Sequence, residues 1–102
     1  MELLTEEIKR TLPQLNSQDS NTDPVCVLKF FLPDAGWTWY VVEGSEQKDG
    51  DWVFFGMVVS PMAPLGEMGC FSLSELMSVR GALGLSVERD LYWTPKPIWE
   101  CK

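Results

Sequence analysis

Three apolar runs joined by short polar connections constrain the fold of this chain more than any other feature of its sequence. The runs cover residues 25–32, 37–43 and 51–60, and they are rich in the aromatic and β-branched residues that favour strands. The connections PDAG and GSEQKDG are short enough to join antiparallel neighbours. The sequence therefore predicts three consecutive antiparallel strands that form a meander.

Helix signals lie on both sides of these runs. Thr5 is a predicted N-cap, and Pro13 is predicted to end the first helix after about two turns. The second helix begins with a capping box that joins Ser72 to Glu75, and Gly81 is predicted to end it in the left-handed conformation. The spacing of apolar residues predicts the buried face of this second helix: Leu73, Leu76, Met77 and Val79.

Two shorter strands, over residues 68–71 and 87–93, are predicted to complete the sheet. The predicted fold class is α+β: a single domain over residues 1–102, with an antiparallel sheet of four to five strands and two short helices packed on one face. In the second run, apolar residues occupy both sides of the strand. We therefore expect one side of the sheet to carry the helices and the other to be a candidate partner surface.

Charge disfavours one class of direct partner. The chain of 102 residues has 15 acidic and 8 basic side chains, no histidine and a formal net charge of -7. This charge repels phosphate, so direct binding to nucleic acid is disfavoured. The same charge attracts a protein with a basic surface, although it also serves solubility alone.

The cysteines and the hydropathy pattern predict the location of the protein. Cys26, Cys70 and Cys101 are odd in number and have no CxxC spacing, so we expect no disulfide framework. The chain starts with charges where a secretory signal needs an apolar stretch, and no apolar run approaches the roughly 18 residues of a membrane span. We expect a cytoplasmic protein in a reducing compartment, without membrane attachment.

No catalytic motif emerges from the sequence. The absence of histidine removes the usual general base and the Ser-His-Asp and Cys-His arrangements, and three scattered cysteines do not make a four-ligand zinc site. Neither glycine-rich nucleotide-binding loop is present. We therefore predict a protein that is not an enzyme, with no catalytic residue, no metal ligand and no cofactor.

Carboxylates and aromatic rings remain as candidates for function. Asp49 and Asp51 flank a glycine and are typical of a turn, whereas Glu88 and Asp90 share one side of a predicted strand, where Arg80 could pair with either. Such carboxylate pairs can hold Mg²⁺, which leaves a metal-dependent hydrolase as an alternative. We instead assign these carboxylates, and two tryptophans beside the prolines near the chain end, to partner binding: Glu43, Asp49, Asp51, Glu88, Asp90, Trp93 and Trp99.

Five blocks of the chain resemble a bacterial family: MELLTEEIKRTLP, WTWYVVEG, DGDWVFFGMV, GCFSLSEL and RGALGLSVERDLYW. This is the domain-of-unknown-function family numbered twenty-nine fifty-eight, and the resemblance extends from Met1 to about Pro95. The resemblance implies a small protein of plasmids, integrative elements and phages, and it assigns no residue a catalytic role.

The functional hypothesis depends on this genomic setting, the charge and the small size. We expect a binding protein that inhibits a host defence nuclease, as an anti-CRISPR or anti-restriction protein, by occupying its basic nucleic-acid-binding surface. The alternatives are an accessory or structural protein of conjugation or replication and, with less support, the carboxylate-based hydrolase. The sequence leaves the oligomeric state open.

Overall fold

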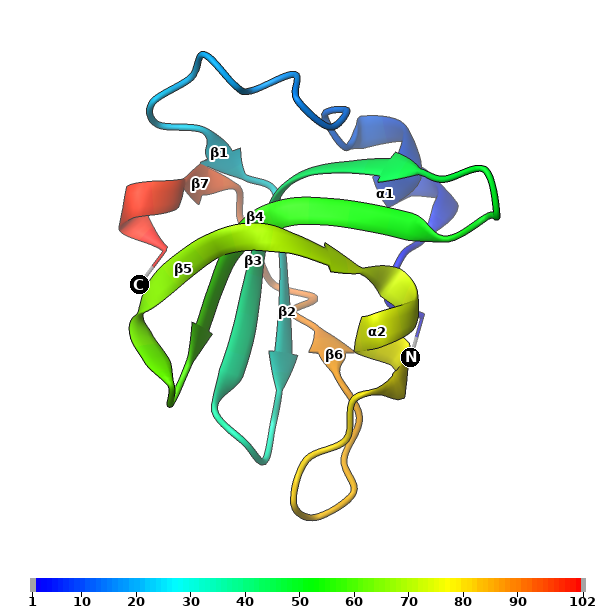
Figure 1. Ribbon diagram of the computed structural model, residues 1–102, viewed down its shortest axis with the longest axis vertical. Helices are drawn as coiled ribbons and strands as arrows, with labels where there is room; N and C mark the ends of the chain where they lie inside the picture. Colours follow the sequence, from blue (N-terminus) through cyan, green and yellow to red (C-terminus); the bar gives the residue numbers. More distant parts are fainter. Residues whose placement is uncertain (1, 102) are drawn as a thin grey trace.

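The computed structural model describes residues 2–101, and its main element is an antiparallel sheet of five strands (Figure 1). The strand order across the sheet is β5-β4-β3-β2-β6. The strands are β2 (Leu28–Leu32), β3 (Trp37–Glu46), β4 (Trp52–Ser60), β5 (Ala63–Ser72) and β6 (Glu88–Arg89). The α+β class holds, and the predicted antiparallel meander is confirmed from β2 to β5.

Two strands differ in length from their predictions. β5 is longer than expected, because it pairs with β4 back to the tight turn that follows Ser60. The strand predicted over 87–93 is mostly wrong, since only Glu88 and Arg89 pair with β2. The chain then turns at Asp90, whose Oδ1 accepts the N–H of Tyr92 at 2.9 Å. An aspartate that binds its own backbone two residues on favours a turn over a strand.

The first apolar run is not one strand, which corrects its prediction. β1 (Val25–Cys26) leaves the main sheet and pairs with β7 (Lys96–Pro97) in a second sheet of two strands. A short 3-10 helix, η1 (Ile98–Glu100), follows β7. At the break between β1 and β2, the N–H of Val27 still donates to the carbonyl of Val41 at 2.9 Å. The C-terminal segment is therefore joined to the sheet through β1.

Both predicted helices are present, and each has six residues. α1 (Glu6–Thr11) begins where the Thr5 hydroxyl accepts a backbone N–H of the first turn at 3.2 Å. α2 (Leu73–Ser78) begins with the predicted capping box, in which Ser72 and Glu75 each accept the other's backbone N–H. No helix in the described part of the chain is long and apolar enough to cross a membrane.

The end and the buried face of α2 differ from their predictions. Val79 caps the helix in an extended conformation, and Gly84 rather than Gly81 is left-handed, with φ at 82°. Leu76 is buried at 1% exposure, but Met77 is 60% exposed, so the prediction for Met77 is wrong. A helix of six residues has too few turns to form a long buried stripe.

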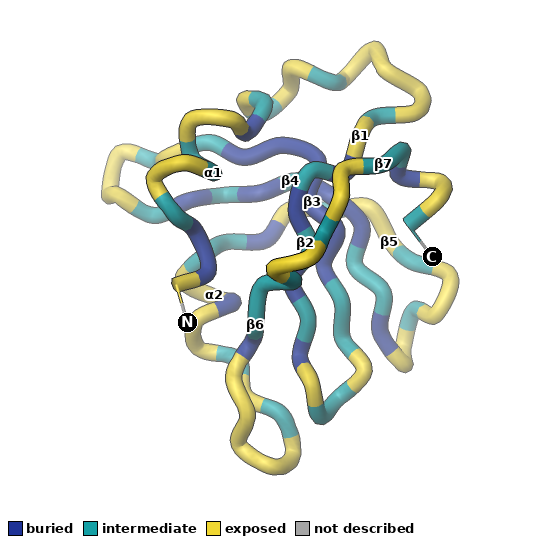
Figure 2. The backbone as a smooth tube through the Cα atoms, turned by 180° about the vertical axis from the view of Figure 1, so that it is seen from behind, coloured by how far each residue is buried: buried dark blue, intermediate teal, exposed yellow. Residues whose placement is uncertain are grey.

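Two apolar clusters lie on opposite sides of the sheet, because side chains alternate along each strand. Figure 2 shows that buried residues follow the strands, whereas the connecting loops are largely exposed. The larger cluster joins the sheet to side chains of both helical segments: Leu3, Leu4, Leu12, Leu28, Phe30, Leu32, Trp39, Val41, Trp52, Phe54, Phe71, Leu76 and Val87. The smaller cluster contains residues of β1, β3, β4 and η1: Cys26, Tyr40, Val42, Met57 and Ile98.

Candidate functional site

A β-bulge in β3 determines where the candidate site forms. The register between β3 and β4 shifts between Val41 and Glu43, and the bulge places Val42 and Glu43 beside the same pocket. Glu43 is only 3% exposed, so its assignment as an exposed partner-binding carboxylate is wrong. A carboxylate buried in an apolar strand needs hydrogen-bond donors from its surroundings.

The Glu43 carboxylate holds the loop that follows α1. The N–H of Asn16 donates to its Oε1 at 2.9 Å, and the N–H of Gln18 donates to its Oε2 at 2.7 Å. Two further hydrogen bonds of 2.9 Å join the same loop to Gly44 and Ser45 of β3. The loop is therefore fixed to the sheet, although its polar sequence predicted only a surface connection.

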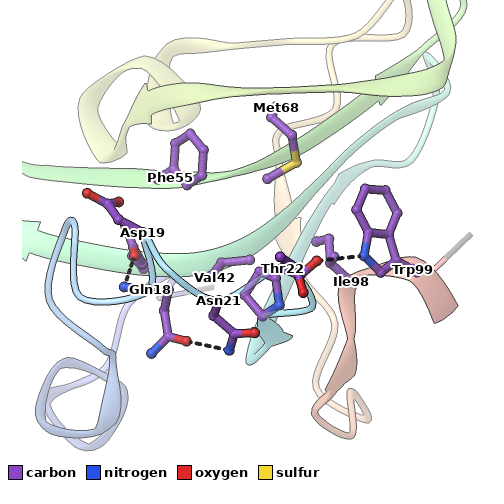
Figure 3. Close-up of a pocket in the computed structure, with 11 residues that line it drawn as sticks. Gln18, Asp19, Asn21, Thr22, Val42, Phe55, Met68, Ile98 and Trp99 are labelled. Atoms are coloured by element: carbon purple, nitrogen blue, oxygen red, sulfur yellow. Dashed lines mark hydrogen bonds between the residues drawn. The ribbon is translucent and has the colours of Figure 1, made fainter.

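A trough of about 240 Å³ lies between this loop and strands β4 and β5 (Figure 3). Its apolar side includes Phe55 of β4 and Met68 of β5, its polar side includes Asp19 and Thr22 of the loop, and η1 adds Trp99. We call this feature the acidic trough. It is lined by Gln18, Asp19, Asn21, Thr22, Pro24, Val42, Glu43, Phe55, Met68, Ile98 and Trp99.

Trp99 is exposed but held in one position. It is 66% exposed, as expected, and its indole Nε1–H donates to the carbonyl of Thr22 at 3.0 Å. The neighbouring Ile98 is buried at 1% exposure, and its N–H donates to the carbonyl of Pro24 at 2.9 Å. An exposed ring that is already ordered loses little conformational entropy when a partner covers it. Contact between Trp99 and a partner stays a prediction.

The charged side chains that line the trough are negative among the described residues. They are Asp19 and Glu43, and no lysine or arginine within residues 2–101 lines the trough. Asp19 is exposed, and it forms no ion pair within residues 2–101. Negative charge beside aromatic and thioether groups suits a cationic side chain with an apolar stem.

Trp93 belongs to the smaller cluster rather than to an open surface. It is half-buried, and its ring packs on Tyr40 with the centroids 5.7 Å apart. Its Nε1–H donates to the carbonyl of Cys26 at 3.0 Å, and the Lys96 ammonium lies 4.6 Å from its ring centroid. These contacts give Trp93 a structural role, and its assignment to partner binding has no support in this geometry.

Glu88 and Asp90 do not line the acidic trough. Glu88 is half-buried on β6, and Asp90 Oδ2 lies 3.9 Å from the Nζ of Lys29 on β2. Arg80 does not pair with either carboxylate, which corrects a further prediction. Its Nη1 instead donates to two backbone carbonyls at the end of α2, each at 2.8 Å. Carbonyls at the end of a helix lack partners within the helix, so they accept readily from arginine.

Asp49 and Asp51 lie in the hairpin between β3 and β4, also outside the trough. Asp49 Oδ1 accepts the N–H of Asp51 at 3.0 Å, which agrees with the turn interpretation. The Asp51 carboxylate accepts the hydroxyl of Ser74 at 2.6 Å and the N–H of Ser74 at 3.1 Å. The Ser74 hydroxyl lowers the pKa of Asp51 below its usual value. Asp51 thus attaches the start of α2 to the hairpin.

The thiols of Cys26 and Cys101 have little nucleophilic character near neutral pH. Burial raises the pKa of Cys26 to about 12 and also raises the pKa of Cys101. Cys70 is exposed on β5. Within residues 2–101, no three or more Cys, Asp or Glu side chains gather as a metal site requires.

Sequence reasoning missed the polar side of the trough. Gln18, Asp19, Asn21 and Thr22 belong to a segment that was expected only to connect α1 with the first strand. One signal indicates their role: Glu43 stands in an apolar run, where a buried carboxylate needs donors from another segment.

The comparisons with known proteins agree with the resemblance of the sequence blocks. A family model described as "Protein of unknown function (DUF2958)" matches residues 3–98, which include every trough residue except Trp99. The searches of curated proteins and of solved structures gave no match. The chain therefore belongs to the family of proteins of unknown function DUF2958.

Proposed function

We propose that the protein is a non-enzymatic binding protein of a mobile genetic element that inhibits a host defence nuclease by occupying its basic nucleic-acid-binding surface. One observation carries this proposal: the acidic trough has an exposed and fixed Trp99 at one end and, at the other end, Asp19, which has no ion-pair partner among the described residues (Figure 3). The net charge of -7 favours the same kind of partner. The mobile-element setting and the nuclease target follow from the resemblance, and no described residue is assigned to either.

An arginine of the partner suits the chemistry of the trough. A guanidinium stacks on aromatic faces and forms two parallel hydrogen bonds with a carboxylate. Asp19 provides the carboxylate and Phe55 an aromatic face at the same end of the trough, and Trp99 provides a second aromatic face at the other end (Figure 3). The apolar stem of the arginine can lie against Met68. An arginine bound in this way no longer contacts the phosphates of a nucleic acid.

Acidic side chains outside the trough act at longer range. Glu46 and Asp49 are exposed near the β3–β4 hairpin, where they add to the negative potential around the molecule. Such charges speed association with a basic surface, and salt screens them beyond about 8 Å at physiological ionic strength. Trp99, as the anchor, mainly controls the rate of dissociation.

A nuclease assay tests the proposal. The purified protein is titrated against CRISPR effectors and restriction enzymes of the host, and inhibition of one enzyme should be complete near a stoichiometric ratio. Guide RNA or DNA in excess should compete with the protein, and salt raised from roughly 50 to roughly 500 mM should slow association. A panel without any inhibited enzyme contradicts the proposal, as does inhibition that is indifferent to both salt and nucleic acid.

Matched variants locate the contact. Trp99→Ala should weaken binding by about tenfold or more, because truncation of an aromatic hot spot typically costs ~2 kcal/mol or more. Asp19→Asn should weaken it less, through loss of one charge in the trough. Met62→Ala is the control for Trp99→Ala, since Met62 is exposed and does not line the trough. Asp49→Asn removes one charge outside the trough, so it should slow association slightly and leave the dissociation rate unchanged. Equal effects of Trp99→Ala and Met62→Ala would remove the trough from the proposal.

A further inference from the structure

The loop between α2 and β6 presents apolar side chains to solvent. Figures 1 and 2 show this loop projecting from the sheet beside the turn between β2 and β3, with its tip exposed. Leu83 is 80% exposed and Leu85 is 45% exposed. The stretch from Gly81 to Val87 contains no charged residue, in a chain whose net charge is -7. Two exposed leucines on an uncharged loop indicate an interaction surface.

The loop is held in one position by hydrogen bonds. The N–H of Leu83 donates to Asp34 Oδ2 at 2.7 Å, which ties the tip of the loop to the β2–β3 turn. The backbones of Arg80 and Ser86 form an isolated antiparallel β-bridge across the base of the loop. Leu83 is therefore presented in a defined position, and little conformational entropy is lost when another molecule covers it.

Gly81 leaves room for the Asp34 carboxylate that accepts the hydrogen bond from Leu83. A Cβ at this position would lie 1.5 Å from Asp34 Oδ1, so any side chain here would displace the carboxylate. Asp34 Oδ1 is buried and has no hydrogen-bond partner among the described atoms. Burying an unsatisfied carboxylate oxygen is costly. The hydrogen bond from Leu83 to Asp34 thus fixes the position of Leu83, while the buried Oδ1 of Asp34 lowers the stability of the fold.

An apolar pocket of about 320 Å³ lies beside the loop. Trp37 and Trp39 line it, and their rings are stacked with centroids 5.9 Å apart. Arg80 is the only charged residue in the described part of the lining, and its Nη1 is already bound to backbone carbonyls. The full lining is Leu32, Ala35, Trp37, Trp39, Val79, Arg80, Gly81 and Ala82.

We propose that this surface binds a second copy of the chain, with Leu83 of each copy inserted into the Trp37 and Trp39 pocket of the other. The protruding leucine and the pocket share one stretch of chain, since Ala82 lines the pocket and Leu83 follows it. If a two-fold axis relates the two copies beside this stretch, each copy inserts its Leu83 into the pocket of the other. An interface of this symmetry forms a closed dimer, which adds no third copy.

Charge favours this position over others for contact with a second copy. Two chains of net charge -7 repel each other over most of their surfaces, and repulsion is least where no carboxylate is present. The described residues of the pocket lining contain no carboxylate, and the loop from Gly81 to Val87 contains none either. The carboxylate of Asp34 lies against the loop, but its Oδ1 is buried and its Oδ2 accepts the N–H of Leu83. Arg80 adds a positive charge at the boundary of the contact. Like-charge repulsion therefore disfavours other pairings of the same chain more than this one.

Sedimentation of the full chain tests the inference. Over protein concentrations from about 1 µM to about 1 mM the apparent mass should rise from one copy to two. Leu83→Asp should weaken the dimer by about tenfold or more, because each copy would bury an unpaired carboxylate in an apolar pocket. Ala82→Glu at the rim of the pocket should have the same effect, and it serves as a second variant if Leu83→Asp affects the loop itself.

Met62→Asp is the matched control, since Met62 is 87% exposed and lies after β4, outside the loop and the pocket. It should leave the dimer unchanged. A single copy at every concentration overturns the inference, as does a dimer that persists in both Leu83→Asp and Ala82→Glu or one that Met62→Asp disrupts equally. Partner binding through the acidic trough is measured separately, because Leu83 does not line the trough.

Discussion

The larger apolar cluster and the loops around the sheet are held by different forces. In the cluster, the fully buried rings of Phe30 and Phe54 lie 5.7 Å apart, and contact among many apolar atoms excludes water. The loops depend instead on carboxylates that accept backbone N–H groups. Glu43 holds the loop after α1, Asp34 holds the loop after α2, and Asp51 holds the start of α2.

This difference changes the meaning of the negative charge. Glu43, Asp34 and Asp51 each accept at least one backbone N–H from a distant segment, so part of the acidity stabilises the fold. Such carboxylates are not available to form new bonds with a partner unless a loop is released. The exposed Asp19 carries its charge without such a role, and it lines the trough.

A substitution in the larger apolar cluster should cause the largest loss of stability. Phe54→Ala removes a ring that packs on Phe30 and Phe71, and it should lower the free energy of unfolding by about 3 to 5 kcal/mol. Urea denaturation followed by tryptophan fluorescence measures the loss. Phe55→Ala is the control, because Phe55 is next in the strand but only half-buried on the opposite side. If the two variants lose equal stability, the larger cluster is not the main source of stability.

Loss of a carboxylate that holds a loop should cause a smaller loss of stability, confined to that loop. Glu43→Ala leaves the N–H groups of Asn16 and Gln18 without their acceptors, and it should cost about 1 to 3 kcal/mol. Glu43→Gln should cost less, since its amide oxygen still accepts from one of them. Hydrogen exchange should show faster exchange of these two amides in Glu43→Ala. Glu46→Ala, at an exposed position of the same strand, should change stability by less than ~0.5 kcal/mol. Unchanged exchange at Asn16 and Gln18 would show that the carboxylate does not hold the loop.

The strands of the meander were predictable because their signal is local. Alternating aromatic and β-branched residues define β3 and β4 without reference to the rest of the chain. The break at Val27 was not predictable in this way, because it depends on the pairing of β1 with Lys96 and Pro97, far along the sequence. The short β6 likewise depends on a turn at Asp90 that competes with strand continuation.

The candidate site was less predictable than the fold. Proximity to prolines correctly indicated an exposed Trp99, but the same reasoning placed Trp93 on the surface, where its contacts with Tyr40 and Cys26 instead bury it in part. The trough depends on the bulge in β3 and on hydrogen bonds that reach 25 and 27 residues along the chain from Glu43. Sequence periodicity carries no information on contacts of that separation.

A local polar contact should show a smaller effect than Glu43. Ser72→Ala removes the hydroxyl that accepts the N–H of Glu75 at 3.1 Å, and loss of this cap should cost about 1 kcal/mol. Thermal unfolding followed by circular dichroism measures the loss. Ser78→Ala at the end of α2 is the control, because its hydroxyl donates to a carbonyl and caps no N–H group. A loss for Ser78→Ala that equals the loss for Ser72→Ala would mean that the capping box adds no specific stability.

The smallest effect should come from Asp51, because this residue is only half-buried and water still screens its interactions. The Ser74 hydroxyl holds the folded pKa of Asp51 below the unfolded value, so this contribution to stability is present above the unfolded pKa and is lost as the pH falls through the folded pKa. Ser74→Ala removes the hydroxyl but keeps the N–H bond, and the pKa of Asp51 should rise toward its ordinary value. An NMR titration of the Asp51 carboxyl measures this rise directly. The variant should therefore lose less stability than the parent as the pH falls from neutral to below the folded pKa of Asp51. Ser17→Ala is the control, because its hydroxyl bonds to the loop after α1 and does not contact Asp51. An unchanged pKa of Asp51 in Ser74→Ala would show that the Ser74 hydroxyl does not stabilise the carboxylate. The bond from the Ser74 N–H would then be the contact through which Asp51 holds α2, in the same way that Glu43 and Asp34 hold the other two loops through backbone N–H groups.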